Sequence, residues 1–130
     1  MESAITIEVR CTHLDVMGHV NNAKYLEYLE WGREDWYEKV GVDFNSLIRR
    51  GLGTVVVNIN INYRKEATQG DILTVRTKPL KRGNKSYVLY HEITNEDGEV
   101  VVDATVTNVV IDTKDKRSVQ LIKEIARYFE

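Results

Sequence analysis

The segment of residues 13–25 places a carboxylate and a glycine just before the expected beginning of a helix. Asp15 lies in a stretch with neither strand nor helix periodicity, and Gly18 follows it closely. Glycine allows a ligand to approach the backbone. The N–H groups of Asn22 and Ala23 have no acceptor within a helix that begins there, and the helix dipole adds a positive potential. A carboxylate beside such donors suits acyl transfer.

Acyl transfer requires stabilisation of the oxyanion that forms when a carbonyl carbon is attacked. Preorganised N–H groups stabilise this charge, and removing one donor typically costs about 2.7–4 kcal/mol in activation free energy. Asp15 could attack the carbonyl carbon itself or deprotonate a water molecule. Because a thiolate leaves readily, a thioester requires no separate strong general acid. We therefore predict thioester hydrolysis with Asp15 as nucleophile or general base.

A strand and a long helix are expected on either side of this segment. Residues 5–11 alternate between apolar and polar side chains, as in a half-buried strand, and a loop follows. Residues 22–40 have helical periodicity, with Asn21 or Asn22 as the N-cap and Gly41 after the last turn. Opposite a face of glutamates, the apolar stripe of this helix consists of Tyr25, Leu29, Gly32, Trp36 and Val40.

The remainder of the chain is expected to consist mainly of strands. Alternation and turn signals predict four more strands, at residues 55–63, 71–79, 86–94 and 99–112. In the first of these, one face carries Val55, Val57, Ile59, Ile61 and Tyr63. Turns are expected at residues 81–85 and at residues 95–98, so that consecutive strands form hairpins.

Two short helices complete the expected elements. One spans residues 44–50, between Asp43 as N-cap and Gly51, and the other is capped by Ser118. The second helix is expected to carry Leu121, Ile122, Ile125 and Phe129. One long helix and about five strands make an α+β domain, in which a curved antiparallel sheet wraps around the helix. The exposed edges of such a sheet favour pairing between subunits.

Composition limits the classes of function. The chain, residues 1–130, is expected to form a single domain that needs no metal or disulfide to fold. Its net charge of −2, without a dominant basic stripe, argues against nucleic-acid binding. No apolar run is long enough to cross a membrane, and the first residues lack a basic region followed by an apolar run, so no secretory leader is expected. Cys11 is the only cysteine, so no disulfide can form within the chain, and we predict a cytoplasmic protein. The side chain of Cys11 is expected to be buried in the first strand.

The pattern around Asp15 resembles that of a known family. It reads Asp15-x-x-Gly18-His19-Val20-Asn21-Asn22-Ala23-x-Tyr25, followed by Tyr28 and Glu30. The pattern looks like the signature of hotdog-fold acyl-CoA thioesterases of the 4-hydroxybenzoyl-CoA type, and a shorter form is similar to plant acyl-ACP thioesterases. The resemblance implies a hotdog fold, Asp15 as the catalytic carboxylate and an oxyanion contact from the backbone N–H of Asn22. It also implies a homodimer or homotetramer with active sites at subunit interfaces, and no cofactor is predicted.

Further residues are predicted to assist catalysis or to bind the substrate. His19 is expected to orient the loop or to hydrogen-bond the substrate rather than to transfer a proton. Contacts with the substrate are predicted from Met17, Gly18, Val20 and Tyr25. Basic side chains bind phosphates well, and the family resemblance implies that CoA lies along the surface. The CoA phosphates are therefore predicted to be bound by Arg64, Lys81, Arg82 and Lys85.

Several alternatives remain open. The spacing of His13, Asp15 and His19 matches no zinc pattern, so no metal is predicted. Trp31, on the acidic face of the long helix, could cover a subunit interface or line the site. The same fold could serve a non-catalytic acyl-CoA-binding module, or a hydratase or dehydratase. The carrier could be CoA or acyl carrier protein, and the acyl group stays open because the hydroxybenzoyl type has an aromatic residue where Asn22 stands.

Overall fold

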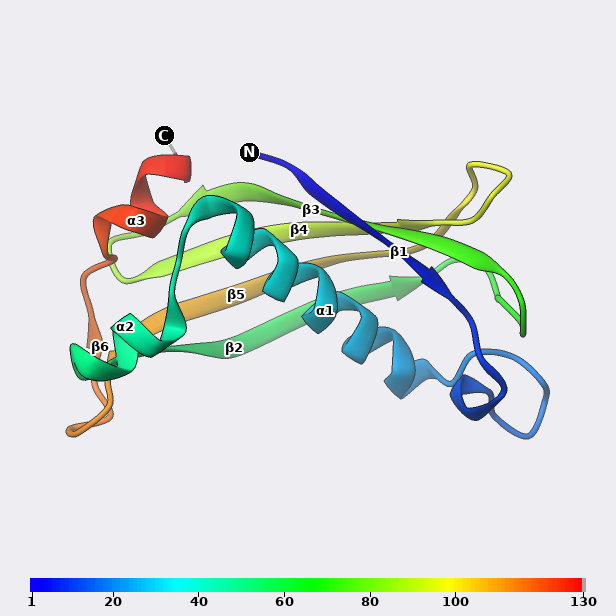
Figure 1. Cartoon of the computed structure of the whole chain (residues 1–130), viewed down its shortest axis with the longest axis horizontal. Coiled ribbons are helices and arrows are strands. Elements are labelled where there is room, and N and C mark those ends of the chain that lie inside the picture. The colour runs from blue at the N-terminus through cyan, green and yellow to red at the C-terminus, as the bar shows by residue number, and fades with distance from the viewer. Residues whose placement is uncertain (130) are drawn as a thin grey trace.

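One long helix lies along one face of a curved antiparallel sheet (Figure 1). The computed structural model describes residues 1–129, and within them the helix α1 spans Asn22–Val40. The six strands of the sheet are β1 (Ser3–Glu8), β2 (Leu52–Tyr63), β3 (Ile72–Arg82), β4 (Ser86–Thr94), β5 (Val100–Asp112) and β6 (Ser118–Val119). Their order is β1-β3-β4-β5-β2, and β6 pairs with β5. The predicted sheet wrapped around one helix is therefore confirmed, with one short strand more than expected.

The helix α1 begins and ends where the sequence predicts. The side chain of Asn21 accepts a hydrogen bond from the N–H of Ala23 at 2.8 Å, which caps the first turn. Gly41 adopts the left-handed conformation with φ +82° and terminates the last turn. The predicted apolar stripe is buried against the sheet throughout its length. No helix within residues 1–129 is both long and apolar enough to span a bilayer.

Close packing of α1 on the sheet depends on Gly32. A Cβ atom at this position would lie 2.9 Å from Thr77 Oγ1 and 2.9 Å from Val75 Cγ1, both on β3. Such distances are far shorter than van der Waals contact, so only glycine permits the observed approach. The buried apolar side chains next to α1 fall into two clusters, one around Leu29 and the other around Trp36.

A β-bulge in β2 changes which side chains of this strand face α1. The pairing of β2 with β5 shifts between Val56 and Asn58, so Val57 has no partner on β5. Val56 lies opposite Asn108 and Ile59 opposite Val106, and both β5 residues are buried beneath α1. The α1-facing row of β2 therefore consists of Tyr63, Ile61, Ile59, Val56 and Thr54.

The prediction that Val55 and Val57 share a face with Ile59 was therefore wrong. One extra residue at the bulge reverses the alternation of side chains beyond it. Val55 pairs with Val109 on the face away from α1, and Val57 has no partner on β5.

The N-terminal strand ends earlier than predicted, at Glu8 rather than at residue 11. Its partner β3 begins at Ile72, opposite Glu8, so no ladder continues beyond this point. The chain instead forms the 3₁₀ helix η1, Cys11–His13, in which the alternation of the strand is lost. Cys11 is consequently exposed, which corrects the expectation that its side chain is buried.

The C-terminal segment also differs from the prediction. Ser118 does not cap a helix, because Ser118 and Val119 form β6 and pair with Ile111 and Val110 of β5. The helix α3 begins later, at Lys123–Ala126, and is followed by the 3₁₀ helix η2, Arg127–Phe129. The expected short helix α2, Phe44–Arg49, is present, and Asp43 accepts from the N–H of Asn45 at 3.0 Å as its N-cap.

Candidate active site

The loop before α1 closes around the carboxylate of Asp15. Oδ1 of Asp15 accepts hydrogen bonds from the N–H groups of Met17 at 2.9 Å and His19 at 3.3 Å. The N–H of Asp15 donates to the carbonyl oxygen of His19 at 2.8 Å, and that of Gly18 donates to the carbonyl oxygen of Asp15 at 3.1 Å. Gly18 has φ +81°, a conformation that side-chain-bearing residues rarely adopt. The loop thus holds one oxygen of Asp15 and leaves Oδ2 free of hydrogen bonds from residues 1–129.

The first turn of α1 lies beside this loop. Leu14 pairs with Val20 in a short antiparallel bridge, and the N–H of Val20 donates to the carbonyl oxygen of Ala67 at 2.8 Å. Asn22 occupies the first helical position, where the backbone N–H has no acceptor within the helix. The side chain of Asn21 accepts from the N–H of Ala23 and so occupies that donor. The backbone N–H of Asn22 is left as the donor that can face a ligand.

A cavity of about 300 Å³ connects the loop, the helix start and the end of β2. It is lined by Asp15, Val20, Asn22, Tyr25, Tyr63, Lys65 and Glu66. Four of the predicted site residues therefore meet in one cavity. Sequence reasoning missed Tyr63, Lys65 and Glu66, since only the pairing of β2 with β5 brings the end of β2 beside the helix start. The hydroxyl of Tyr63 donates to the carbonyl oxygen of Asn22 at 3.0 Å.

Tyr25 contributes a buried hydroxyl to this cavity. Its side chain is 4% exposed, and the hydroxyl has no hydrogen-bond partner within residues 1–129. Burial raises the pKa of Tyr25 to about 12, with the backbone of Ala67 partly opposing the shift. The hydroxyl therefore stays protonated at neutral pH.

His19 and His13 hold neighbouring parts of the loop. Nδ1 of His19 lies 3.3 Å from a carboxylate oxygen of Glu66, and both side chains are partly exposed. Nδ1 of His13 lies 2.7 Å from the hydroxyl of Tyr28, and burial lowers the pKa of His13. Among residues 1–129, no three His, Cys, Asp or Glu side chains are grouped as a metal site. Neither imidazole lines the cavity, so the supporting role expected of His19 stays a prediction.

Trp31 packs beside these groups. Its ring centroid lies 6.3 Å from that of His13 and 5.4 Å from that of Tyr28, and its side chain is half-buried. Trp31 thus packs against the segment before α1 through His13 but does not line the cavity.

Other predicted substrate contacts lie outside the cavity. Met17 is 74% exposed at the tip of the loop and does not line the cavity. Gly18 does not line it either, but its positive φ allows the loop to turn. Arg64 forms an ion pair with Asp103 beside the cavity, and Lys65 forms one with Glu99 at 3.0 Å. These two basic side chains are the ones that the fold places near Asp15.

The structure does not bring Lys81, Arg82 and Lys85 to the cavity of the same chain. Lys81 and Arg82 lie within β3 rather than in the expected turn, because the strand continues past Pro79 through a bulge. The hairpin between β3 and β4 adjoins the C-terminal segment, at the end of the sheet opposite the Asp15 loop (Figure 1). At about 3.3 Å per residue, the length of β3 separates the two ends by roughly 30 Å.

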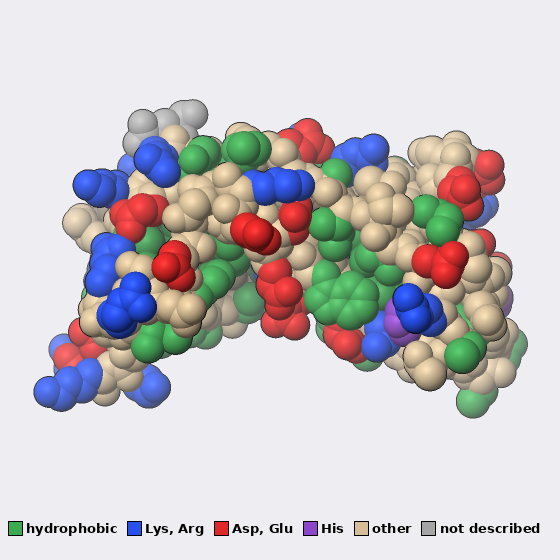
Figure 2. Space-filling view, viewed as in Figure 1, with side chains coloured by type: hydrophobic (Ala, Val, Ile, Leu, Met, Phe, Trp, Pro, Cys, Tyr) green, Lys and Arg blue, Asp and Glu red, His purple; other side chains and the backbone are tan. Residues whose placement is uncertain are grey.

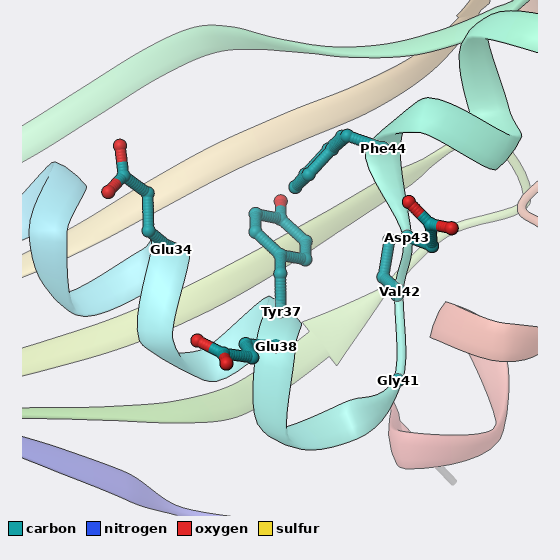
Figure 3. Close-up of a pocket in the computed structure, with 7 residues that line it drawn as sticks. All are labelled: Glu34, Tyr37, Glu38, Gly41, Val42, Asp43 and Phe44. Atoms are coloured by element: carbon teal, nitrogen blue, oxygen red, sulfur yellow. The ribbon is translucent and has the colours of Figure 1, made fainter.

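A second cavity, of about 400 Å³, lies at the other end of α1 (Figure 3). Three carboxylates line it, but Figure 3 shows Glu34, Glu38 and Asp43 pointing in different directions around Tyr37 and Phe44. The carboxylate of Asp43 is already engaged as the N-cap of α2. This cavity therefore lacks converging acids and does not resemble a catalytic site.

Comparisons with known proteins identify the family of this chain. The family model described as Thioesterase-like superfamily matches residues 9–129. Long-chain acyl-CoA thioesterase FadM of Escherichia coli is 43% identical over 125 residues, covering 95% of this chain and 94% of FadM. A crystal structure of the probable thioesterase YbaW from Escherichia coli is 40% identical, with a TM-score of 0.82, and the match covers 96% of this chain and 94% of that one. The chain therefore belongs to the thioesterase-like superfamily.

The hotdog fold is confirmed by a more distant structure. A 4-hydroxybenzoyl-CoA thioesterase, solved with 4-hydroxybenzoyl-CoA, superposes with a TM-score of 0.90 over 99% of both chains. At 19% identity, this likeness concerns the fold alone. The predicted family is confirmed, and the relatives named above are thioester hydrolases, as the sequence predicts for this chain.

Proposed function

We propose that the protein is an acyl-CoA thioesterase that cleaves its substrate in the Asp15 cavity. Oδ2 of Asp15 either attacks the carbonyl carbon or removes a proton from the attacking water. The N–H of Asn22 stabilises the oxyanion, assisted by the dipole of α1. Collapse of the intermediate breaks the carbon–sulfur bond and releases CoA as a thiolate. In the covalent route, water then hydrolyses the mixed anhydride with Asp15 to give the free acid.

The observation that carries this proposal is the meeting of Asp15 and Asn22 in one cavity. The loop supplies two N–H donors to one carboxylate oxygen, which keeps the other oriented for reaction. The helix start supplies a donor with no partner in the helix. The activity of FadM on long-chain acyl-CoA, given by its name, supports the same substrate class for this chain.

The remaining cavity residues are assigned to substrate binding. Val20 and Tyr25 line the cavity and contact the thioester end of the acyl group. Arg64 and Lys65, both exposed near the cavity, bind the CoA phosphates in competition with their present carboxylate partners. His19 keeps the loop against Glu66.

We also propose that the active protein is a homo-oligomer, with a homodimer as the smallest unit. β2 is an edge strand in the sheet order, and it exposes Val55 and Val57. Unpaired backbone groups beside apolar side chains favour strand pairing with a second copy. Sedimentation velocity tests this proposal, because a Val57→Lys variant should shift the protein toward monomer. The predicted cytoplasmic location is consistent with the exposed, unpaired Cys11.

The experiment that tests the proposed function is a thiol-release assay. Wild-type protein is incubated with short, medium, long and aromatic acyl-CoAs, and free CoA is followed with a thiol reagent. Hydrolysis of long acyl-CoAs that is lost in Asp15→Asn supports the proposal. Binding without hydrolysis would favour a non-catalytic module, while formation of a hydroxyacyl or enoyl product would favour a hydratase or dehydratase. A single turnover in heavy-oxygen water separates the two routes, since only covalent attack labels Asp15.

A further inference from the structure

A groove runs from the Asp15 cavity along α1 and β2. On the helix, Asn22, Leu26, Arg33 and Tyr37 follow one another at spacings of four, seven and four, which places them on one side of α1, the side beside β2. On the strand, the facing row runs from Tyr63 to Thr54. In Figure 2, this edge of the molecule is hollowed between α2 and the loop before α1, and apolar side chains are visible along it.

The middle of this groove is apolar and open. Leu26 and Ile59 are each 37% exposed, and Val56 is 40% exposed. These side chains come from both walls and lie between the Asp15 cavity and the far end of the groove. An acyl chain bound by its thioester at Asn22 would bury them.

The far end of the groove, by contrast, is polar and contains a buried cation. A cavity of about 280 Å³ is lined there by Arg33, Tyr37, Thr54, Val56 and Asn108, among others. Arg33 is only 7% exposed. Nη1 of Arg33 lies 3.3 Å from Nε2 of His91, and the guanidinium forms no ion pair within residues 1–129. A guanidinium has five N–H donors, so most of those of Arg33 lack an acceptor.

The imidazole and the two tyrosine hydroxyls near Arg33 do not supply that acceptor. Because Arg33 can only donate, Nε2 of His91 accepts, and Nδ1 carries the proton that faces Thr77 Oγ1 at 2.9 Å. Burial, reinforced by Arg33, lowers the pKa of His91 to about 3, so this imidazole is neutral and already saturated. The hydroxyls of Tyr37 and Tyr87 hydrogen-bond each other. The remaining N–H groups of Arg33 are therefore free to donate to a ligand oxygen bound in this cavity.

The charges around this cavity indicate which kind of ligand oxygen can bind next to Arg33. Glu30 and Glu34 also line the cavity, and both are exposed at its rim. Two carboxylates beside one guanidinium disfavour a second anion, whereas a hydroxyl or keto oxygen can accept from Arg33 without repulsion. A neutral oxygen is therefore the better match.

We propose that the enzyme selects acyl chains that carry a hydroxyl or keto oxygen at the far end of the groove, held by Arg33. This inference rests on the proposed function, because the thioester is placed at Asn22. Eleven residues of α1 separate Asn22 from Arg33, or about 16 Å at 1.5 Å per residue. With carbon–carbon bonds of about 1.5 Å, the oxygen lies on the order of a dozen carbons from the thioester.

The test compares two isomers, dodecanoyl-CoA with a hydroxyl on the terminal carbon and dodecanoyl-CoA with a hydroxyl on the β-carbon. Their affinities for the Asp15→Asn protein are measured by titration calorimetry, since this variant keeps the substrate intact. We expect the terminal isomer to bind about tenfold more tightly, as for one hydrogen bond to a charged group. Arg33→Met should remove the difference, and Arg33→Lys should restore part of it.

A second variant keeps the test valid if the Arg33→Met protein does not fold. Val56→Phe fills the far end from the exposed strand and leaves Arg33 in place, so it should also remove the preference. Leu80→Phe is the matched control, because Leu80 is also exposed but lies on β3, which β4 and β5 separate from β2, and it should leave the preference unchanged.

The outcomes separate this inference from the proposed function. Equal binding of the two isomers, or a preference that survives Val56→Phe, would overturn the inference. Such a result would show that Arg33 serves the fold or a second copy of the chain instead. Absence of CoA release by the wild-type protein from every acyl-CoA would overturn the proposed function, while the binding comparison would still decide on the oxygen subsite.

Discussion

The two ends of the α1–β2 groove carry opposite charges in opposite surroundings. At one end, Asp15 is an exposed carboxylate whose own loop donates two backbone N–H groups to it. At the other end, Arg33 is a buried guanidinium with a neutral imidazole as its hydrogen-bond partner. Water and the loop satisfy Asp15 before any ligand binds, which leaves it available for reaction. Arg33 is largely buried and lines a cavity, so the partners of its remaining donors depend on what occupies that cavity.

The largest expected effect concerns the Asp15 end. Asp15→Asn preserves the size of the side chain and its acceptor oxygen for the loop, but the amide can neither attack nor accept a proton. We expect kcat for thioester hydrolysis to fall by about 10²–10⁴-fold, with little change in substrate affinity. Asp43→Asn is the matched control, because asparagine also caps α2 and Asp43 lies far from the Asp15 loop. A variant that retains hydrolysis would remove Asp15 from the mechanism.

The Arg33 end should respond to pH through His91. The folded protein holds the pKa of His91 at about 3, against 6.5 in the unfolded chain. Stability is therefore unaffected above pH 6.5 and is lost as the pH falls toward 3, because only the unfolded chain takes up the proton. Between pH 7 and 5, this loss amounts to about 2 kcal/mol in the free energy of unfolding.

His91→Gln isolates this effect, since the amide can accept from Arg33 and donate to Thr77 without titrating. Urea unfolding at each pH should show a smaller decrease in the variant than in the wild type. His19→Gln, at a partly exposed position, should keep the wild-type decrease. Equal decreases for His91→Gln and wild type would mean that water enters the Arg33 end, and the contrast between the two ends would disappear.

The backbone of the Asp15 loop gives a smaller effect. Gly18→Ala introduces a Cβ at φ +81°, where nothing lies within 4 Å, so backbone strain is the only direct cost. We expect a loss of about 1–2 kcal/mol in the free energy of unfolding. We also expect a decrease in kcat, because the strain displaces the N–H groups that hold Asp15.

Gly98→Ala imposes the same strain in the hairpin between β4 and β5, where φ is +78° and space is also open. This control should lose similar stability but keep the wild-type kcat. If both alanine variants hydrolyse the substrate equally well, the geometry of the Asp15 loop does not limit the reaction.

The smallest effect is expected at the junction of β2 with the helix start. Tyr63→Phe removes the hydrogen bond to the carbonyl oxygen of Asn22 at an exposed position. We expect the free energy of unfolding to decrease by about 0.5–1.5 kcal/mol and kcat to decrease by a few fold. Tyr90→Phe, which removes a hydroxyl contact with Glu92, is the control and should leave kcat unchanged. A large loss of activity would assign Tyr63 a direct contact with the reacting groups.

Local patterns predicted the Asp15 end well. Asn21, Gly41 and the stripe from Tyr25 to Val40 act within a few residues of one another, so spacing alone located α1 and its caps. Asp15, Val20, Asn22 and Tyr25 lie on one continuous segment, and their meeting in a cavity follows from the short bridge between Leu14 and Val20. The family resemblance rested on the same segment.

The Arg33 end was decided by contacts between residues far apart in the sequence. A bulge at Val57, which no local signal marked, turned Val56 toward α1 and Val55 away from it. Arg33 lies beside His91 and lines a cavity with Asn108 only because β4 and β5 pair beneath the helix. The sequence by itself determined the helix, its caps and the segment bearing Asp15, since these depend on local backbone and side-chain preferences. Tertiary structure alone decided which side chains face the groove, because strand register and burial are properties of the whole sheet.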